Sequence, residues 1–375
     1  MLKVIHAISD TNIGGAGRWV LTFLSEVDKK NFDVKIILPE GSKLIPEIEK
    51  LGASYFAIKG MADKSYDRSA VGEIKKILRA EKPDIVHAHA AMSARIAAFF
   101  AGVKNITYTR HSVFEPKESL KKGIGRTVNR IVDKMTAKKI ISVAEAAKKN
   151  VVDMGVHSDK IQVIYNGVNL LERYDKKKVD EFKKELGVPK DVPVIALAAR
   201  VTEVKGQDYL IKAAKILKDS GYDARIVIAG TGDKEEEFKD LSKELGLDDY
   251  VIFTGFLKDI TGLMNAMDIQ ANASFGTEAA SLSLMEGMSL GKPSVVTDYG
   301  GNPELITDGH NGYVVPQKDE NAMALAIISL LEDKKLYDVM SKNALDVYNK
   351  RFTAKIMTRN IEKFYRELIK GGSIK

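Results

Sequence analysis

The sequence contains no cysteine in its 375 residues. Disulfide bonds, thiolate metal ligands and redox-active thiols are therefore excluded. No apolar run reaches the roughly 18 residues that a membrane-spanning helix needs. The opening stretch MLKVIHAISD enters an alternating strand pattern directly, without the layout of a signal peptide. Together these absences predict a cytoplasmic protein.

Two ligand-binding signatures are also missing. No suitable loop carries a DxD-type acidic metal motif. The glycine-rich turn Gly14-Gly15-Ala16-Gly17 follows the first expected strand, but the dinucleotide fingerprint needs a small residue at position 20, where valine stands. NAD binding is therefore disfavoured. Two interpretations of the turn stay open: a plain tight turn, or a loop whose glycines let a phosphate approach backbone N–H groups.

Positive charge is unevenly spread. The chain has 58 Lys and Arg against 51 Asp and Glu, a net charge of +7. The first 150 residues hold 27 of the basic residues and 16 of the acidic ones, whereas the remainder is net negative. Such a basic half suits nucleic acid, an anionic membrane surface or an acidic substrate.

Short apolar runs alternate with helical patterns along the first half, which predicts a doubly wound parallel sheet. The expected strands lie at 3–9, 34–39, 54–58, 85–88, 105–109 and 139–142. Turn residues and charge dominate 166–193, which we interpret as a linker. The α/β pattern then restarts, with strands expected at 194–199, 225–229, 250–255, 269–273 and 294–297. Residues 353–370 form an expected C-terminal amphipathic helix.

The stretch from 275 to 304, FGTEAASLSLMEGMSLGKPSVVTDYGGNPE, has the clearest chemistry. Seven residues separate Glu278 from Glu286. We expect Glu278 at a strand–helix junction and Glu286 two helical turns further in, on nearly the same face, because eight residues turn a helix by nearly a whole number of turns. Such carboxylates accept hydrogen bonds from vicinal hydroxyls, and the start of the helix favours phosphate. The backbone N–H groups at that start belong to Ala279, Ala280, Ser281 and Leu282. The block therefore predicts a sugar-nucleotide site.

Loops after other expected strands hold further candidates. Arg200 and Lys205 follow the strand at 194–199, where ligands of parallel sheets bind. The Arg200 guanidinium can donate two parallel hydrogen bonds and the Lys205 ammonium acts as a point charge, so the two suit a diphosphate. The alternative is a solvated basic pair on a loop. The loop with Gly230 and Gly232 suits phosphate or ribose, and Phe256 follows a strand where it suits a nucleobase.

Three histidines lie on or after neighbouring expected strands. His87 and His89 alternate along one strand and so share a face, which predicts buried or cleft-lining side chains in preference to a metal site. His111 follows the next strand, where its imidazole is placed to contact a sugar hydroxyl or a developing charge.

An amphipathic helix is expected between 120 and 138. Basic residues recur at Lys122, Arg126, Arg130, Lys134 and Lys138. Apolar residues recur on another face at Leu120, Ile124, Val128, Ile131 and Met135. Two interpretations stay open: a helix lying on an anionic membrane, or a solvated basic face above an ordinary core stripe. No aromatic residues are interleaved with the charge, so nucleic acid is not an expected partner.

Taken together, these features resemble the retaining glycosyltransferases of family 4 over essentially the whole chain. The similar segments are the GGAG turn, PDIVHAH, AEAAKKN, IYNGVN, AR with KGQDYL, AGTGDKEEEFK, and the E-x7-E block with its GGNPELITDGHNGYVVP tail. The resemblance implies the GT-B fold, in which two Rossmann-like doubly wound α/β domains face a cleft. It places the N-terminal domain at 1–168, completed by a C-terminal helix at 354–375, and the C-terminal domain at 169–353.

The resemblance also implies a role for each candidate residue. Gly14 and Gly15 approach the donor diphosphate and the acceptor, Arg200 and Lys205 bind the diphosphate, Glu278 contacts the hydroxyls of the donor sugar, Glu286 contacts the ribose, and His111 lies near the donor sugar. The chain departs from the family at Glu278-Ala279-Ala280-Ser281, where members often have Glu-Gly-x-Pro. The donor sugar is therefore not predicted.

The expected reaction is transfer of a hexose or N-acetylhexosamine from a nucleoside-diphosphate sugar, UDP before GDP, to an acceptor hydroxyl with retention. No cofactor or metal is expected, because cations and helix N-termini stabilise the leaving diphosphate. We expect a sugar or lipid-linked acceptor in cell-envelope polysaccharide or glycolipid synthesis, and a protein peripheral on the inner membrane face or free in the cytoplasm. The alternatives are a GT-B sugar-nucleotide epimerase or phosphorylase and a non-catalytic nucleotide-sugar-binding protein.

Overall fold

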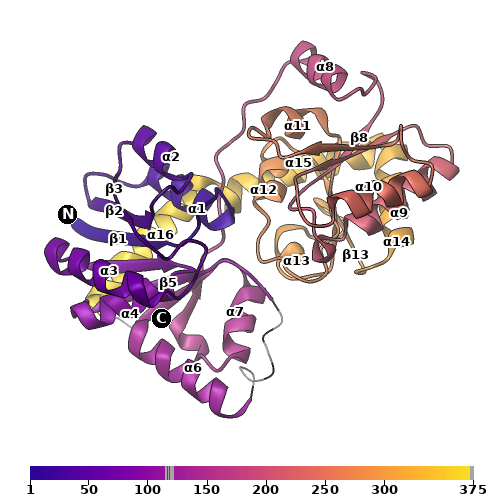
Figure 1. Ribbon diagram of the computed structural model, residues 1–375. Coiled ribbons are helices and arrows are strands. Elements are labelled where there is room, and N and C mark those ends of the chain that lie inside the picture. The colour runs from indigo at the N-terminus through magenta and orange to yellow at the C-terminus, as the bar shows by residue number, and fades with distance from the viewer. Residues whose placement is uncertain (115, 117, 119–121, 372–375) are drawn as a thin grey trace. The chain divides into compact units, whose positions relative to one another are not determined.

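The computed structural model describes residues 1–114, 116, 118 and 122–371. The chain forms two compact α/β units, shown in Figure 1. One comprises Met1–Gly167 with Ala354–Lys375, and the other comprises Val168–Thr353. The first and last segments of the second unit lie side by side, because the Val168 backbone N–H donates to the Phe352 carbonyl at 3.0 Å.

The first unit is built on a seven-stranded parallel sheet. In chain order its strands are β1 (Leu2–Ile8), β2 (Phe32–Pro39), β3 (Ser54–Ile58), β4 (Ile85–His89), β5 (Asn105–Arg110), β6 (Lys139–Ser142) and β7 (Ile161–Val163). They are ordered β3-β2-β1-β4-β5-β6-β7. The winding direction reverses between β1 and β4, and ligands of such sheets bind beyond the carboxyl ends of the strands at this point.

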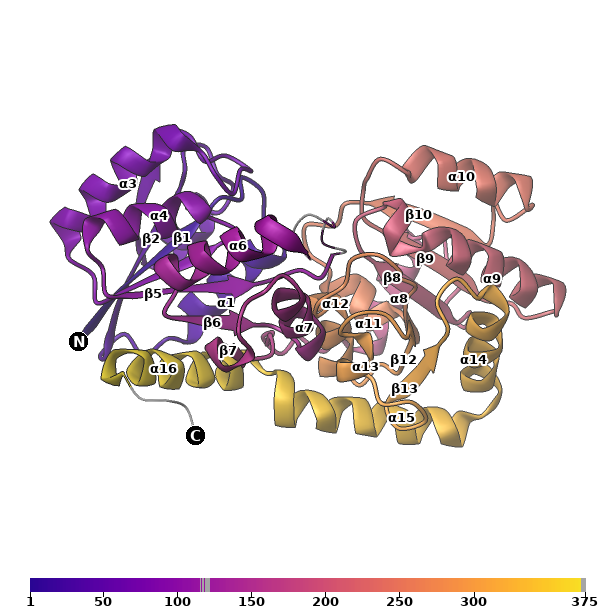
Figure 2. The ribbon, with the colours of Figure 1, turned by 90° about the horizontal axis from the view of Figure 1, so that it is seen from below.

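Helices cover both faces of this sheet. They are α1 (Gly15–Glu26), α2 (Ile45–Lys50), α3 (Arg68–Glu81), α4 (Met92–Ala101), α6 (Gly123–Thr136), α7 (Glu145–Asp153) and α16 (Ala354–Lys370). One core packs α1, α2 and α16 against the sheet, and another packs α3 and α4 against its opposite face. Figure 2 shows α16 on one side and α3 and α4 on the other. The C-terminal helix is therefore an integral part of the first unit.

The second unit repeats the architecture with a six-stranded parallel sheet, ordered β10-β9-β8-β11-β12-β13. Its strands are β8 (Val194–Ala198), β9 (Arg225–Ala229), β10 (Val251–Gly255), β11 (Ile269–Asn272), β12 (Ser294–Thr297) and β13 (Gly312–Val315). Its helices are α8 (Lys176–Glu185), α9 (Gln207–Asp219), α10 (Glu235–Glu244), α11 (Thr261–Ala266), α12 (Leu282–Ser289), α13 (Asn302–Leu305), α14 (Glu320–Glu332) and α15 (Lys334–Val347). The winding reverses between β8 and β11.

Both sheets confirm the predicted fold class of two doubly wound α/β domains. Central strands such as β1 and β8 are buried along most of their length, which explains their continuous apolar runs. Several helices begin at a capping aspartate whose carboxylate accepts a backbone N–H, as Asp67 does for α3 and Asp319 for α14. The elements that the sequence did not predict include β7, β13, α13 and α15.

Candidate functional site

Three loops of the second unit meet at the carboxyl ends of neighbouring strands. Arg200 and Lys205 follow β8, Gly230 follows β9, and Glu278 follows β11. Because β8 lies between β9 and β11, these loops flank the point where the winding reverses. The fold thus gathers residues that are up to 78 positions apart in the sequence.

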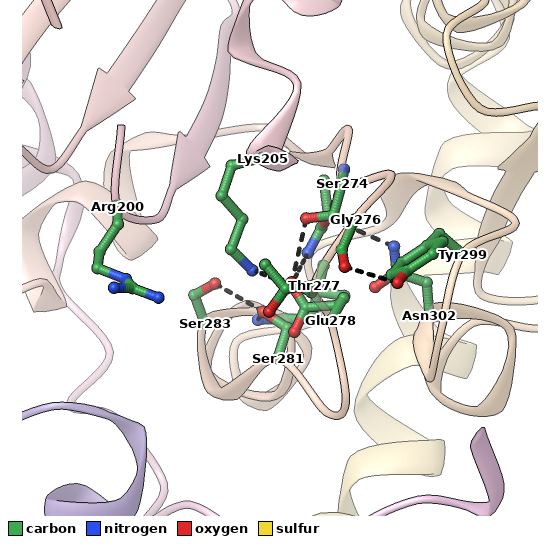
Figure 3. A network of polar contacts seen from close by, with 12 residues as sticks. Arg200, Lys205, Ser274, Gly276, Thr277, Glu278, Ser281, Ser283, Tyr299 and Asn302 are labelled. Atoms are coloured by element: carbon green, nitrogen blue, oxygen red, sulfur yellow. Dashed lines mark hydrogen bonds and ion pairs between the residues drawn. The ribbon is translucent and has the colours of Figure 1, made fainter. Parts of the chain in front are cut away.

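Lys205 and Glu278 form a nearly buried ion pair. The Lys205 Nζ lies 2.9 Å from Glu278 Oε2, and the two side chains are 13% and 9% exposed. Asn272 Nδ2 and Ser274 Oγ donate to the same Glu278 oxygen at 3.1 and 3.3 Å. Figure 3 shows Lys205 and Ser274 beside Glu278. The extra hydrogen bonds matter because a buried ion pair is stable only when its remaining polar atoms are also satisfied.

The loop that carries Glu278 is held in place by its backbone. Lys205 Nζ also donates to the Thr277 carbonyl at 2.8 Å, and the Tyr299 hydroxyl donates to the Gly276 carbonyl at 2.7 Å. Gly300 has φ 58°, and a Cβ there would lie 1.9 Å from the Glu278 carbonyl oxygen. The glycine pair after β12 therefore allows the two loops to pack closely, which orients the carboxylate before any ligand binds.

The structure confirms Glu278 at a strand–helix junction, but the two glutamates do not share a helical face. The helix α12 begins at Leu282, so Glu278 lies in the preceding loop and only Glu286 lies on the helix, where it is 3% exposed. The side chain of Ser281 caps α12 by accepting the Leu284 N–H at 3.4 Å. The backbone of Ala279, Ala280, Ser281 and Leu282 thus runs from the ion pair into the helix start, where the helix dipole favours an anion.

Arg200 is exposed at the end of β8, in contrast to Lys205. Its backbone carbonyl accepts a hydrogen bond from Gln207 Nε2 at 2.9 Å. In the part of the chain that the structure describes, its guanidinium makes no hydrogen bond or ion pair, and Figure 3 shows it extending toward the start of α12. The prediction of a solvated basic pair therefore fits Arg200 and fails for Lys205.

The glycines of the β9 loop are explained by close backbone packing. A Cβ at Gly230 would lie 1.9 Å from the Ala199 carbonyl oxygen, and one at Gly232 would lie 1.9 Å from the Val201 carbonyl oxygen. These glycines let the β8 and β9 loops touch, whether or not a phosphate binds there. Phe256, after β10, is 70% exposed, so its ring is open to a ligand.

Gly14 and Gly15 at the start of α1 differ from Gly230 and Gly232, because they do not pack against a backbone carbonyl. Gly14 has φ −86°, Gly15 is not among the residues with positive φ, and a Cβ on Gly15 would meet no atom within 4 Å. Neither backbone conformation nor packing within the chain requires glycine at position 15. The Gly14 N–H donates to the Asn12 carbonyl at 2.9 Å, which is a tight turn, while the open space at Gly15 leaves room for a ligand, so both interpretations of the loop stay open.

The three histidines predicted in the first unit lie together. His87 and His89 are fully buried, and His89 Nδ1 is 2.9 Å from His111 Nε2, just beyond β5. Burial, with the neighbouring Arg110 charge, lowers the pKa of His111 to about 3, so the imidazole is neutral near pH 7. The sequence missed His6, which is hydrogen-bonded to His89 although 83 residues separate them.

The basic helix differs from its prediction in two ways. The helix α6 ends at Thr136, so Lys138 lies beyond it, and its Nζ donates to the Leu368 carbonyl at the end of α16. The apolar residues do not form a core stripe, because Ile124, Val128, Ile131 and Met135 are 84, 51, 49 and 50% exposed. Leu120 lies outside the described residues. In the described part of the chain, no helix is long and apolar enough to span a membrane.

Comparisons with known proteins agree with this architecture. The family model "Glycosyltransferase Family 4" matches residues 13–171, and "Glycosyl transferases group 1" matches residues 178–347. An uncharacterised glycosyltransferase of Methanocaldococcus jannaschii is 30% identical over 290 residues, 73% of each chain. UDP-Gal:alpha-D-GlcNAc-diphosphoundecaprenol alpha-1,3-galactosyltransferase of Escherichia coli is 26% identical over 98% of this chain and 97% of that one.

Solved structures share the whole fold. Anabaena HepE in complex with UDP and glucose superposes with a TM-score of 0.86 at 21% identity, over 98% of this chain and 100% of that one. Matches of both family models, a relative at 30% identity and the paired parallel sheets lead to one conclusion. The chain is a glycosyltransferase of family 4 with the GT-B fold.

Proposed function

We propose that the enzyme transfers a sugar from a UDP-sugar to a hydroxyl of a sugar or lipid-linked acceptor, with retention at the anomeric carbon. The Lys205–Glu278 pair carries this proposal. Lys205 uses two of its three N–H donors, on Glu278 and the Thr277 carbonyl, and the third is left for a phosphate oxygen. Every hydrogen bond from the described residues to the Glu278 carboxylate ends on Oε2, which leaves Oε1 for a sugar hydroxyl.

The choice of UDP is supported by the relatives. The Escherichia coli relative is named for a UDP-Gal donor, and the HepE structures hold UDP, UDP with glucose, or UDP-glucose. A GDP-sugar is the second candidate. The acceptor class is supported by the same Escherichia coli name, which specifies a lipid diphosphate. Envelope glycolipid or polysaccharide synthesis is therefore the proposed context.

In the proposed mechanism, fixed charges stabilise the leaving diphosphate. Lys205, Arg200 and the N–H groups at the start of α12 supply this charge, so we expect transfer without a divalent metal or cofactor. Glu278 orients the donor sugar, and buried Glu286 on α12 is assigned to the ribose. In the first unit, Gly14 and Gly15 are assigned to the donor diphosphate and the acceptor. His111 is assigned to the donor sugar.

The test is the substitution Glu278→Gln, which keeps the shape of the side chain and removes its charge. Because a neutral amide orients and polarises the sugar less well, we expect UDP release in the presence of acceptor to fall about 100-fold or more, with UDP binding nearly unchanged. Exposed Glu185→Gln on α8 is the matched control. An unchanged transfer rate in Glu278→Gln would remove Glu278 from the site. Donor conversion without UDP release would instead favour the epimerase.

We further propose that α6 lies on an anionic membrane, where a lipid-linked acceptor is found. Its exposed side combines Ile124, Val128, Ile131 and Met135 with the exposed cations Arg126, Arg130 and Lys134, and exposed Lys122 directly precedes it. Asp133, the one acid of α6, is buried in an ion pair with Arg95. The exposed charge of α6 is therefore entirely positive, as an interfacial helix requires.

The double substitution Arg126→Gln and Arg130→Gln tests this. Each basic residue near an anionic surface contributes about 1 kcal/mol, so we expect about 30-fold weaker binding to phosphatidylglycerol vesicles. Exposed Lys176→Gln with Lys177→Gln on α8 should leave vesicle binding unchanged. If the α6 variant keeps vesicle binding but loses a concentration-dependent dimer, the face joins two copies of the chain and the membrane proposal fails.

A further inference from the structure

Six polar side chains of the first unit form one continuous hydrogen-bonded chain, in which each side chain bonds the next. They come from β1, β4, β5, the loop after β5, and α16. Their order is Thr109, His87, Tyr365, His6, His89 and His111, with successive distances of 2.7, 2.6, 3.1, 2.9 and 2.9 Å. This hydrogen-bonded chain ends at His111, the one member assigned to the donor side, and its third member is Tyr365 on the C-terminal helix.

A metal site is the obvious alternative for these histidines. Ring nitrogens of His6, His87 and His89 lie within 4.8 Å of one another. However, each of the six ring nitrogens of these residues is already hydrogen-bonded within the hydrogen-bonded chain. A cation would have to break several of these bonds in a fully buried core. The geometry therefore favours a hydrogen-bonded chain.

The chain must be directional, because its histidines are neutral. Burial lowers the pKa of His6 to about 3 and holds those of His87 and His89 well below the usual range. A neutral imidazole has one N–H and one lone pair, and Tyr365 has a single hydroxyl proton. Each ring therefore donates to one neighbour and accepts from the other. Two arrangements remain, which run in opposite directions.

Thr109 distinguishes the two directions. If Thr109 donates to His87, every proton but the last has an acceptor, and the last one lies on Nδ1 of His111, whose side chain is only half-buried. If the direction is reversed, Thr109 accepts from His87 and its own buried hydroxyl proton has no second acceptor among the described residues. A buried unsatisfied donor costs about 1–3 kcal/mol, so the first direction is favoured.

We propose that Tyr365, His6 and His89 are positioning residues that hold His111 as its Nδ1–H tautomer, so that His111 donates a hydrogen bond to an oxygen of the sugar nucleotide. Nδ1 of His111 is suited to this, because in the described part of the chain it makes no hydrogen bond. His111 then acts as a donor and not as a proton acceptor. The role in transfer rests on the proposed function, whereas the tautomer does not.

The wild-type protein, labelled with ¹⁵N at histidine, provides the first test. The chemical shifts of the two ring nitrogens distinguish the tautomers by NMR. We expect His6, His87, His89 and His111 all to be neutral with the proton on Nδ1. A proton on Nε2 of His111, or a charged ring within the chain near pH 7, would overturn the proposal. This spectrum decides the matter even if the enzyme is inactive toward every UDP-sugar tried, which would reject the proposed function alone.

Tyr365→Phe tests the positioning role, because it interrupts the chain and keeps the ring. We expect about tenfold lower kcat, an unchanged KM for the donor, and a second tautomer of His111 in the spectrum. Tyr348→Phe is the matched control, since the Tyr348 hydroxyl bonds the Val168 carbonyl in the other unit. Full kcat and a single His111 tautomer in Tyr365→Phe would show that the chain does not position His111.

Substituting His111 itself tests which nitrogen is used. His111→Asn places an amide near the position of Nδ1, and His111→Gln places one near that of Nε2. We expect kcat to fall about tenfold for the asparagine variant and about 100-fold for the glutamine variant. The reverse order would contradict donation from Nδ1. If Tyr365→Phe does not fold, this pair and the wild-type spectrum still decide the proposal.

Discussion

The two units share one architecture but hold polar groups at the carboxyl ends of their strands by different means. The second unit uses charge: the Lys205–Glu278 pair, with Arg200 exposed nearby. The first unit uses a chain of neutral side chains that ends at His111. Charge acts strongly with little dependence on direction, which suits a diphosphate. A neutral chain has no net charge but determines where each proton lies, which suits the orientation of a single donor.

The largest effect is expected from removing one charge in the second unit. Lys205→Met removes a phosphate ligand and leaves the buried Glu278 carboxylate with neutral donors only. We expect kcat/KM for the donor to fall about 1,000-fold, measured by UDP release. Lys212→Met, which removes a lysine from a surface i,i+4 pair on α9, serves as the control. If kcat/KM of Lys205→Met stays within a few-fold of wild type, the charge of Lys205 is not what the second unit uses to bind the diphosphate.

A smaller effect concerns the acid stability of the first unit. The pKa of His6 is about 3 in the folded protein and near 6.5 when unfolded. The unfolded chain therefore binds the proton first as pH falls, so His6 lowers stability progressively from pH 6.5 toward pH 3. Its contribution is about 1.4 kcal/mol per pH unit.

His6→Phe should remove this one proton from the pH dependence, while the new ring packs beside Trp19 and Phe23, which His6 contacts. Urea unfolding at pH 7, 6 and 5 measures the slope, and the variant should be less sensitive to acid than wild type. His157→Gln, at an exposed position, is the control. Equal slopes for His6→Phe and wild type would mean that His6 is not buried in its neutral form.

The smallest effect is expected at Arg200, because its side chain is exposed and solvent screens its charge. Arg200→Gln should weaken UDP binding about tenfold at low salt and less at high salt, as measured by calorimetry. Arg225→Gln, at the opposite end of β9, should not change UDP affinity. A loss at Arg200 that is independent of salt would indicate a role other than electrostatic attraction.

Most strands could be predicted from the sequence because their signal is local. The strands at 54–58, 139–142, 225–229 and 294–297 were predicted at their observed bounds. A continuous apolar run between turn residues is sufficient where helices cover both faces of a sheet. The three-residue β7 is too short for such a signal, and α15 buries few side chains, among them Met340 and Ala344. Neither element has a strong pattern.

The functional residues were less predictable, because their partners are distant in the sequence. A helical spacing rule placed Glu278 and Glu286 on one face, but the helix begins only at Leu282. Spacing indicated that His87 and His89 share a face, but it could not identify His6 or Tyr365 as their partners. The amphipathic pattern of α6 was read correctly as a helix, whereas the exposure of its apolar side depends on what the rest of the fold covers.

The sequence by itself determined the class of fold, the enzyme family and the residue types available for binding a sugar diphosphate, because these depend on local apolar patterns and short motifs. Only the tertiary structure decided which of those residues meet. Lys205 reaches Glu278, and Tyr365 links His6 to His87, through contacts between segments that are 73 to 359 positions apart. Hydrogen bonds and ion pairs require atoms within about 3 Å of each other, and only the packed chain brings such distant residues that close.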